Sequence, residues 1–141
     1  MPVDPVKLAR QFISALPHCR ELNMAVESIE PGCAVLSMPY DDRLIGDPAS
    51  GVLHGGAVST LMDTSCGAAV LSHPDASSTT ATLGLRIDYM RAAVPGQAIR
   101  ARAVCHHVAK NVAFVRASAF DDDDKNPVAT ASGSFTVERR S

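Results

Sequence analysis

The sequence carries one carboxylate and one pair of glycines at a spacing that could build a reactive site. His54, Gly55 and Gly56 begin a proline-free stretch of small and apolar residues, and Asp63 follows the histidine after nine positions. A helix that begins with glycines leaves its first backbone N–H groups unobstructed, and the helix dipole adds partial positive charge there. Such an end can hold a phosphate, a carboxylate or a carbonyl oxygen that gains negative charge.

The stretch 55–71 is predicted to form one buried helix with two unlike faces. At about 100° per residue, its bulky apolar face carries Val58, Leu61, Met62, Ser65, Ala68 and Ala69. Its other face is small and carries Gly56, Ser59, Thr60, Asp63, Gly67 and Val70. The alternative is a core helix that tolerates one acid, but a buried carboxylate without a partner is costly. The lone acid therefore favours a functional site.

Length and composition predict one globular domain over residues 1–141, with a helical N-terminal segment over residues 1–20. The chain has 141 residues, of which 46% are hydrophobic and 20% charged, and its formal net charge is −2. The lack of a basic run argues against nucleic-acid binding. No apolar stretch is long enough to span a bilayer, and the first residues lack the apolar core of a signal peptide. We therefore expect a cytoplasmic protein.

The cysteines indicate neither a disulfide set nor a metal site. They are widely spaced, form no CxxC pair and are expected to be buried free thiols: Cys19, Cys33, Cys66 and Cys105. His106 and His107 directly follow Cys105, which invites a metal interpretation. Neighbouring side chains on a strand point to opposite faces, so the two histidines should not bind one ion. We therefore expect no metal here.

The rest of the chain predicts the elements that position the central helix. Residues 4–16 have helical spacing, with Asp4 as N-cap and Pro17 as terminator, and residues 41–50 form a polar loop. Period-two alternation predicts strands at residues 22–29, 33–40, 81–89, 99–105, 112–120 and 128–137. Hairpin turns join the later strands, so these should pair antiparallel. A sheet of about six strands must bury one face on the only long apolar helix, which gives an α+β fold.

The run Asp-Asp-Asp-Asp-Lys at residues 121–125 is predicted to be a solvated hairpin tip. Two apolar strands flank it and Pro127 follows closely, which is typical of a turn. Its negative charge should not attract an anionic ligand. Neutralising all four aspartates is therefore expected to leave the activity unchanged.

The motif His54-Gly55-Gly56-Ala57, with Asp63 nine residues after the histidine, resembles that of the PaaI-like (4-hydroxybenzoyl-CoA thioesterase type) hotdog-fold thioesterases. Residues 51–53, 85–91 and 113–116 support the resemblance, which covers about residues 20–137. It implies a long helix wrapped by an antiparallel sheet, dimers that share one continuous sheet, and often tetramers. It also implies hydrolysis of acyl-CoA thioesters without a metal or redox cofactor.

Carried over by position, the resemblance assigns roles to four residues. Asp63 would be the general base or the nucleophile, and the backbone N–H of Gly55 would polarise the thioester carbonyl. His54 would position the substrate or its loop, and Thr82 would help to hold the water. A thioester carbonyl is already electrophilic, so polarisation and an activated water or carboxylate suffice for hydrolysis.

The resemblance also indicates residues that bind the substrate. Gly56 continues the helix start beside Gly55. Many relatives have an asparagine before the glycine turn, where Asp47 is the nearest residue here, and an ionised Asp47 cannot donate an amide N–H. The phosphates of coenzyme A need cations, and the candidates are Arg86, Arg91, Lys110 and Arg116, each of which could equally be a solvated surface charge. With only 4% aromatic residues and no tryptophan, the chain favours aliphatic or varied acyl groups over aryl groups.

Three functions compete on this fold. The first is an acyl-CoA thioesterase, the second a non-catalytic acyl-CoA-binding protein, and the third a hotdog dehydratase or hydratase. Asp63 favours the enzyme, because a carboxylate adds little to the binding of a negatively charged ligand. Cys66 is an alternative nucleophile three residues after Asp63, but no histidine is near it in sequence and packing explains it better.

The spacing of the two candidate groups predicts a site shared by two chains. Asp63 lies 8 residues after Gly55, which is about 12 Å along a helix axis. A base must come within about 3 Å of its target, or one water away. Two helices packed antiparallel about a two-fold axis would set each Asp63 beside the other helix's N-terminus. We therefore predict an obligate homodimer whose sites take His54 and Gly55 from one chain, and Asp63 and Thr82 from the other.

Overall fold

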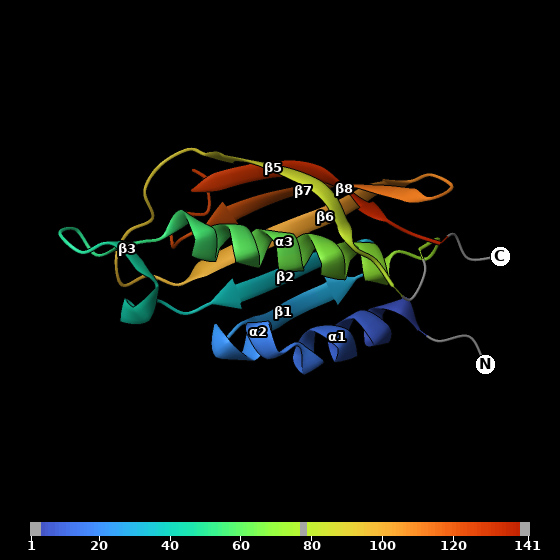
Figure 1. Cartoon of the computed structure of the whole chain (residues 1–141), viewed down its shortest axis with the longest axis horizontal. Coiled ribbons are helices and arrows are strands. Elements are labelled where there is room, and N and C mark those ends of the chain that lie inside the picture. The colour runs from blue at the N-terminus through green and yellow to red at the C-terminus, as the bar shows by residue number, and fades with distance from the viewer. Residues whose placement is uncertain (1–3, 77–78, 139–141) are drawn as a thin grey trace.

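The computed structural model describes residues 4–76 and 79–138, and one long helix, α3 (Gly55–Ser72), lies at its centre. The helix packs on an antiparallel sheet whose strands are β1 (Ala25–Glu30), β2 (Cys33–Met38), β5 (Thr82–Tyr89), β6 (Ile99–Val108), β7 (Val112–Phe120) and β8 (Ala129–Thr136). Their order in space is β1-β2-β6-β7-β8-β5 (Figure 1). The helix wrapped by an antiparallel sheet, as expected of a hotdog fold, is thus confirmed.

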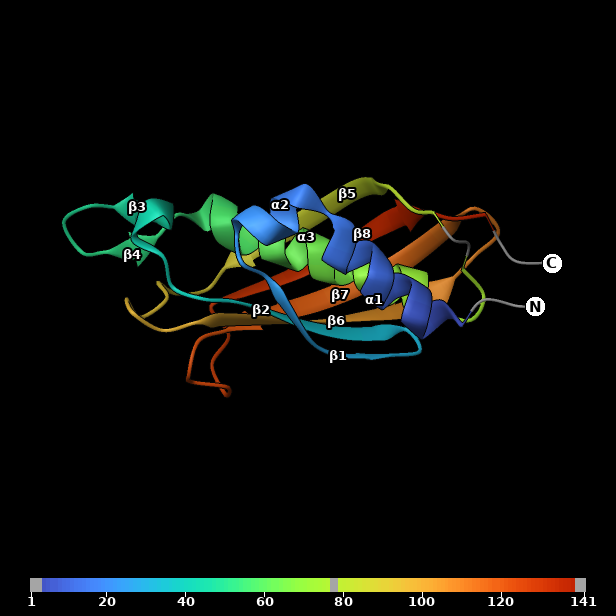
Figure 2. The ribbon, with the colours of Figure 1, turned by 90° about the horizontal axis from the view of Figure 1, so that it is seen from below.

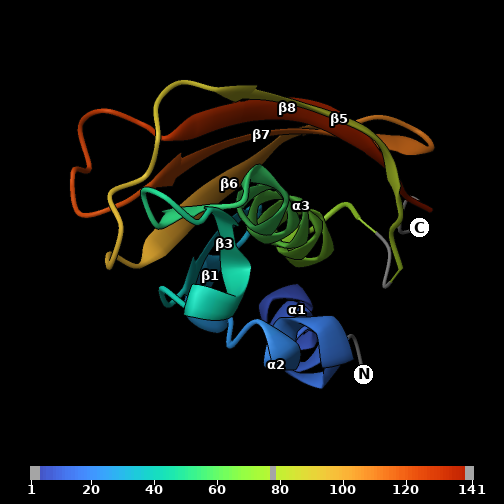
Figure 3. The same ribbon diagram turned by 60° about the vertical axis from the view of Figure 1, so that its left-hand side comes forward.

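The sheet curves because one of its faces packs around the helix α3. Along β6, small or apolar residues from Ile99 to Cys105 alternate inward with exposed residues such as Arg100 and Arg102. Alanines recur at the inward positions of β6, β7 and β8, and small side chains let the strands approach the helix closely. Figure 3 shows the sheet arching over α3 from β5 to β1. The strand pattern predicted from alternation is confirmed.

The alternation along β6 fails where a bulge interrupts the pairing of β6 with β7. Cys105 pairs with Val115 but His107 pairs with Phe114, so His106 is the extra residue. Both histidines are consequently exposed. The prediction that His106 and His107 point to opposite faces is therefore wrong. Among the described residues, no group of three or more histidine, cysteine or acidic side chains is placed to hold a metal ion.

Two N-terminal helices form a third layer on the side of α3 that the sheet leaves uncovered. Asp4 caps α1 (Pro5–Ala15) by accepting from the Val6 N–H at 3.0 Å, as predicted. Pro17 ends this helix but also begins α2 (Pro17–Glu21), which the sequence did not predict. Figure 2 shows α1 and α2 lying over α3, opposite the sheet.

The start of β1 also differs from the prediction. Asn23 adopts a left-handed conformation, with φ of 55°, directly after α2, so the strand begins at Ala25 rather than at residue 22. Because α1 covers it, the C-terminal half of α3 is buried on nearly every side. Val70, assigned to the small face, is fully buried. The contrast between the two faces of α3 therefore holds only in its N-terminal half.

The predicted polar loop 41–50 contains structure of its own. A short 3-10 turn, η1 (Asp42–Leu44), leads into a small hairpin formed by β3 (Ile45–Asp47) and β4 (Val52–Leu53). This hairpin lies at the N-terminal end of α3 (Figure 1). A Cβ at Gly46 would lie 2.7 Å from the Cα of His54, so only glycine lets the chain pass so close to the start of the helix.

The opposite end of α3 is held by a buried hydroxyl. The Ser72 Oγ donates to the carbonyl oxygen of Glu30 at 3.0 Å and accepts from the N–H of Gly32 at 3.1 Å. These bonds join the end of α3 to the turn between β1 and β2. Both ends of the helix are therefore fixed by the surrounding chain.

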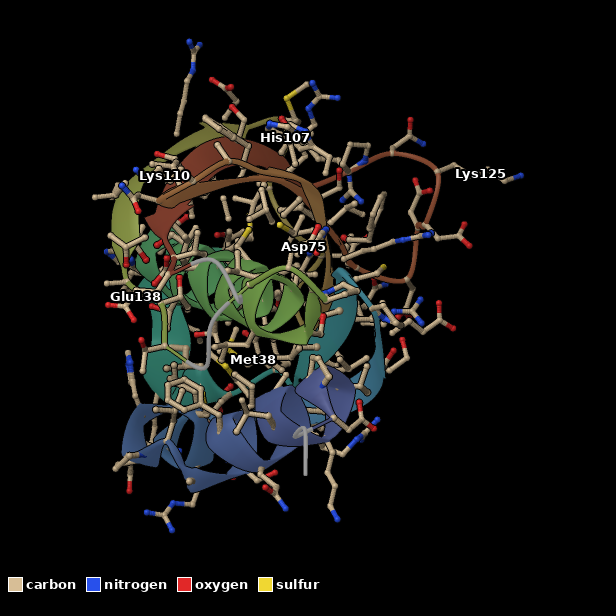
Figure 4. All side chains as sticks on the ribbon, turned by 90° about the vertical axis from the view of Figure 1, so that its right-hand side faces the viewer. Met38, Asp75, His107, Lys110, Lys125 and Glu138 are labelled. Atoms are coloured by element: carbon tan, nitrogen blue, oxygen red, sulfur yellow. The ribbon has the colours of Figure 1, made fainter. Side chains whose placement is uncertain are left out.

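The loop after β7 corrects the prediction of a solvated acidic tip. Asp121 is only 2% exposed, and its carboxylate accepts from two guanidinium nitrogens of Arg91 at 2.7 and 2.6 Å. It also accepts from the backbone N–H groups of Val94 and Asp123. The Arg91 guanidinium holds the pKa of Asp121 well below its usual range. The prediction is confirmed only for residues 122–125, which are exposed, with Lys125 pointing away from the molecule (Figure 4).

Candidate active site

His54 is the N-cap of α3, and its side chain completes the first turn of the helix. The backbone of His54 is extended and its Nδ1 accepts from the N–H of Gly56 at 2.8 Å. This contact uses Nδ1 as the acceptor for one of the backbone N–H groups that have no partner within the helix. The backbone N–H of His54 donates to the carbonyl oxygen of Leu44 at 2.8 Å, which fixes the residue to the end of η1, next to the β3–β4 hairpin. The structure therefore gives His54 a positioning role at the helix start.

Gly55 follows the cap and presents an unengaged N–H group. Among the hydrogen bonds of the described residues, none uses the Gly55 N–H as donor, whereas His54 already accepts from the N–H groups of Gly56 and Ala57. The Gly55 carbonyl oxygen accepts from the Tyr89 hydroxyl at 2.7 Å, which ties the helix start to the end of β5. The helix dipole adds partial positive charge to this N–H. It is thus placed to polarise a carbonyl oxygen.

Asp63 and Thr82 are brought together across 19 residues of sequence. The Thr82 hydroxyl donates to Oδ1 of Asp63 at 2.7 Å, from the first residue of β5 to the middle of α3. Asp63 is half-buried, and Thr82 is the only hydrogen-bond donor to its carboxylate among the described residues. An ionised carboxylate can accept about four hydrogen bonds. The remaining capacity of Asp63 is therefore open to water or substrate.

The helix start and Asp63 border different cavities of the chain. Asp63 and Thr82 line one of about 140 Å³, between α1, α3 and the start of β5. Gly55 lines another of about 260 Å³ with Tyr89 and Met90, and His54 and Gly56 line a third of about 320 Å³. Asp63 lies eight positions after Gly55, which is about 12 Å along the helix. The chain thus holds the two chemical groups at separate places.

Asp47 is occupied by its own turn. Its carboxylate accepts from the Ser50 hydroxyl at 2.6 Å and from the Ala49 N–H at 3.1 Å. These hydrogen bonds, that from Ser50 above all, lower the pKa of Asp47, so the side chain stays an ionised acceptor. The structure gives Asp47 the task of closing the β3–β4 hairpin, and a substrate-binding role stays a prediction.

The four basic residues predicted to bind the phosphates of coenzyme A lie in four different surroundings. Arg86 is exposed on the outer face of β5, 3.3 Å from Asp88, and Arg91 is engaged with Asp121. Lys110 lies in the turn between β6 and β7 (Figure 4). Arg116 lines a hollow of about 490 Å³ with Arg100 and Arg102, on the sheet face away from α3. None of the four lines the described cavity beside Asp63, so their role toward coenzyme A stays a prediction.

Cys66 is a poor nucleophile in this structure. It is fully buried, and desolvation, with a smaller effect of the nearby Asp63 charge, raises the pKa of its thiol to about 12. The attacking species of a cysteine is the thiolate, which is scarce at such a pKa. All four cysteines lie within the described residues and are free thiols, as predicted, but Cys33 is half-buried rather than buried. These observations favour a packing role for Cys66.

Tyr89 is a site residue that the sequence interpretation missed. The strand alternation and the resemblance over residues 85–91 both include Tyr89 but give it no role. Its hydroxyl donates to the Gly55 carbonyl oxygen, and a Cβ at Gly55 would lie 3.2 Å from its ring. The available signal was a polar hydroxyl at the end of an otherwise apolar strand face, because such a tip requires a partner when the ring packs.

The chain is similar in sequence to a protein family and to several known proteins. Residues 50–128 match the family described as the thioesterase superfamily. A putative esterase of Halobacterium salinarum is 34% identical over 145 residues, which cover 96% of this chain and 94% of that protein. The medium/long-chain acyl-CoA thioesterase YigI of Salmonella typhimurium is 25% identical and covers 92% of this chain and 91% of its own.

Solved structures give the same picture of the fold. A crystal structure of a Pseudomonas aeruginosa protein is 43% identical, covers 94% of this chain and 98% of its own, and superimposes with a TM-score of 0.81. The Escherichia coli PaaI protein, from the phenylacetic acid degradation operon, covers 95% of this chain and 93% of its own with a TM-score of 0.83. Its identity of 19% makes it a likeness of fold alone. Among the described residues, no helix is long and apolar enough to cross a membrane.

Proposed function

This chain is a member of the thioesterase superfamily, and we propose that it hydrolyses the thioester of an acyl-CoA to a free acid and coenzyme A. One observation carries the proposal: Asp63, a half-buried carboxylate on α3, has a single hydroxyl donor at 2.7 Å and further acceptor capacity facing a cavity. The similarity to a protein named as a medium/long-chain acyl-CoA thioesterase supports a fatty acyl substrate.

In the proposed reaction, the Gly55 N–H acts on the oxygen of the thioester carbonyl group and Asp63 acts at its carbon. The Gly55 N–H donates to the thioester carbonyl oxygen and stabilises the negative charge that grows there. Asp63 takes a proton from a water that attacks the carbonyl carbon, the carbon–sulfur bond breaks, and the proton passes to the departing thiolate. Alternatively, the Asp63 carboxylate attacks the carbonyl carbon, the carbon–sulfur bond breaks and the coenzyme A thiolate departs, which leaves an anhydride. Water then hydrolyses the anhydride to the free acid and the Asp63 carboxylate, and the proton that the water loses passes to the thiolate. Thr82 holds the carboxylate and offers its oxygen lone pairs to the water.

The proposed site requires a second copy of the chain. Gly55 and Asp63 are too far apart on one helix to meet the same carbonyl group. Among the described residues β5 is an edge strand that pairs only with β8, and Leu83, Tyr89 and Met90 on or beside it are all more than half exposed. An edge strand with unpaired backbone groups and exposed apolar side chains is a ready pairing surface. These features support a homodimer in which the two β5 strands pair and each site combines both chains.

A panel of acyl-CoAs with a thiol-reactive chromogen tests the proposed function. Release of coenzyme A by the wild-type protein, lost in Asp63→Asn, is the expected result. Binding of acyl-CoA without release would favour a non-catalytic binding protein. A change at the acyl double bond with the thioester intact would favour a dehydratase or hydratase. Asp122→Asn is the matched control, because Asp122 is an exposed aspartate outside the site.

A further inference from the structure

Gly67 lies inside α3 although the packing of the chain leaves room for a side chain there. A Cβ at this position meets nothing closer than the ring of Phe135, at 3.8 Å, which is an ordinary van der Waals contact. The backbone is helical, so no left-handed conformation calls for glycine. Glycine within a helix destabilises it relative to alanine. The packing of the chain therefore does not explain Gly67.

The space beside Gly67 belongs to the cavity that reaches Asp63. This cavity holds about 140 Å³, and Gly67 lines it one helical turn after Asp63. Its apolar lining comes from three elements and consists of Phe12, Ile13, Leu16, Gly67, Ala81 and Phe135. A carboxylate with a hydroxyl partner at one end and hydrocarbon walls beyond suits a molecule with a reactive carbonyl and an apolar tail.

One wall of this cavity is the N-terminal helix α1. Ile13 is 3% exposed and anchors α1 in the core, whereas Phe12, next to it, is 44% exposed and lines the cavity. The Phe12 ring therefore lies where a ligand in the cavity would contact it. Figure 3 shows α1 running beneath α3, on the side away from β7 and β8.

We propose that α1 forms a wall of the acyl pocket, and that Phe12 and Gly67 set the length of the hydrocarbon chain that it accepts. The proposal rests on the proposed hydrolysis at Asp63 and specifies its substrate class. Apart from Asp63, the described residues that line the cavity carry no charge, and their only polar side chains are the hydroxyls of Thr64, Thr80 and Thr82. The pocket therefore takes unsubstituted aliphatic chains and disfavours tails with a carboxylate.

Binding of non-hydrolysable S-alkyl-CoA thioethers, from ethyl to dodecyl, measures the pocket without turnover. Each buried methylene should tighten the Kd by about fourfold until the wild-type cavity is full. In Gly67→Val the gain in affinity per methylene should stop at shorter chains. The Kd should rise by about tenfold or more for the longest thioether and by less than about twofold for the ethyl thioether. Phe12→Ala should shift the limit to longer chains, and Gln11→Ala, an exposed neighbour on α1, should match the wild type.

Gly67→Ala is the second variant in case valine disturbs the helix. It should melt at or above the wild-type temperature, because alanine favours the helix and its Cβ has room. Unchanged chain-length profiles in the Gly67 and Phe12 variants would overturn the proposal. So would loss of the dimer in Gly67→Ala with an unshifted profile, because Gly67 would then serve a helix contact between subunits. If the wild type binds thioethers by length but releases no coenzyme A from acyl-CoAs, the pocket stands and hydrolysis fails.

Discussion

Two aspartates of this chain have opposite surroundings. Asp121 is buried and receives four hydrogen bonds, two from Arg91 and two from backbone N–H groups. Asp63 is half-buried and receives one, from Thr82. The first carboxylate has every oxygen position filled by the protein, whereas the second keeps acceptor positions open toward a cavity.

The difference separates an acid that stabilises a fold from one that is available for chemistry. A carboxylate whose partners are all supplied by the chain has nothing left to offer a substrate. A carboxylate with open positions costs the fold some stability, and that cost is expected where function requires it. Burial alone does not make the distinction, because Asp121 is the more deeply buried of the two.

The largest effect is expected at Asp63. Asp63→Asn keeps the size of the side chain but removes the base, so turnover should fall by several orders of magnitude, toward the upper end of the ~10²–10⁴-fold range for such groups. The free energy of unfolding should change by less than about 0.5 kcal/mol, because only one exposed hydroxyl is affected. Steady-state kinetics and urea denaturation measure both. Near-normal turnover would remove Asp63 from the mechanism.

Asp121 should show the reverse pattern. Asp121→Ala leaves the Arg91 guanidinium and two N–H groups without their acceptor, and should cost about 2–4 kcal/mol of stability. Turnover per folded molecule should stay close to that of the wild type. A loss of turnover at normal stability would contradict the structural role assigned to Asp121.

The same pair predicts a pH dependence. Arg91 lowers the pKa of Asp121 in the folded chain, so its stabilising effect is complete above the ordinary carboxyl value of about 4 and is lost as the pH falls through the lowered pKa. The stability difference between wild type and Asp121→Ala should therefore be constant from neutral pH down to about 5 and shrink below about 4. Denaturation at several pH values tests this, and a difference that grows in acid would contradict it.

Thr82 comes next, because within the described part of the chain it is the only hydrogen-bond donor to Asp63. Thr82→Val removes the hydroxyl while keeping the branched shape, and should lower turnover by about tenfold or more, as expected for a hydrogen bond to a charged group. Thr82→Ser, which keeps the hydroxyl, is the control and should retain most activity. Equal rates in the valine and serine variants would mean that the hydroxyl plays no part.

The smallest effect is expected in the loop that holds Asp121. Asp122 and Asp124 are exposed, and the double variant with serine at both positions should change stability by less than about 0.5 kcal/mol and leave turnover unchanged. Asp123 is excluded because it accepts from the Lys125 N–H and the Asn126 side chain. A marked loss of stability or turnover in the double variant would mean that the exposed charges of this loop contribute, and not the buried Asp121 alone.

Local patterns in the sequence predicted most of the fold, and the family resemblance pointed to Asp63 and Thr82. The strands follow from alternation, and the N-cap of α1 follows from Asp4 before Pro5. The motif at His54 predicted where the central helix begins, because two glycines before an apolar stretch are typical of an open helix N-terminus. The pairing of Asp63 with Thr82 needed the family resemblance, since 19 residues separate them.

What the sequence could not predict depends on distant contacts. The four adjacent aspartates look alike in sequence, and only the approach of Arg91 from the segment after β5 makes Asp121 a buried ion-pair partner. The bulge at His106 has no local signal either, because it arises from the register of β6 with β7. Layer packing likewise decided the burial of Val70, once α1 covered that side of α3.

Subunit mixing tests the shared site most directly, with variants that each disable one half. Gly55→Pro removes the N–H, and proline is well tolerated at the first position of a helix after an extended residue such as His54. Gly55→Ala places a similar atom against the exposed Tyr89 ring but keeps the N–H, so it is the matched control. Asp63→Asn disables the other half. Gly55→Pro and Asp63→Asn should each be nearly inactive alone.

Random remixing of these two proteins makes about half of the dimers mixed, and each mixed dimer has one site with both defects and one with none. The account predicts that activity recovers to about a quarter of the wild-type value. If mass spectrometry shows that the subunits have exchanged and the activity stays at the level of the parent variants, then Gly55 and Asp63 do not form one site across two chains.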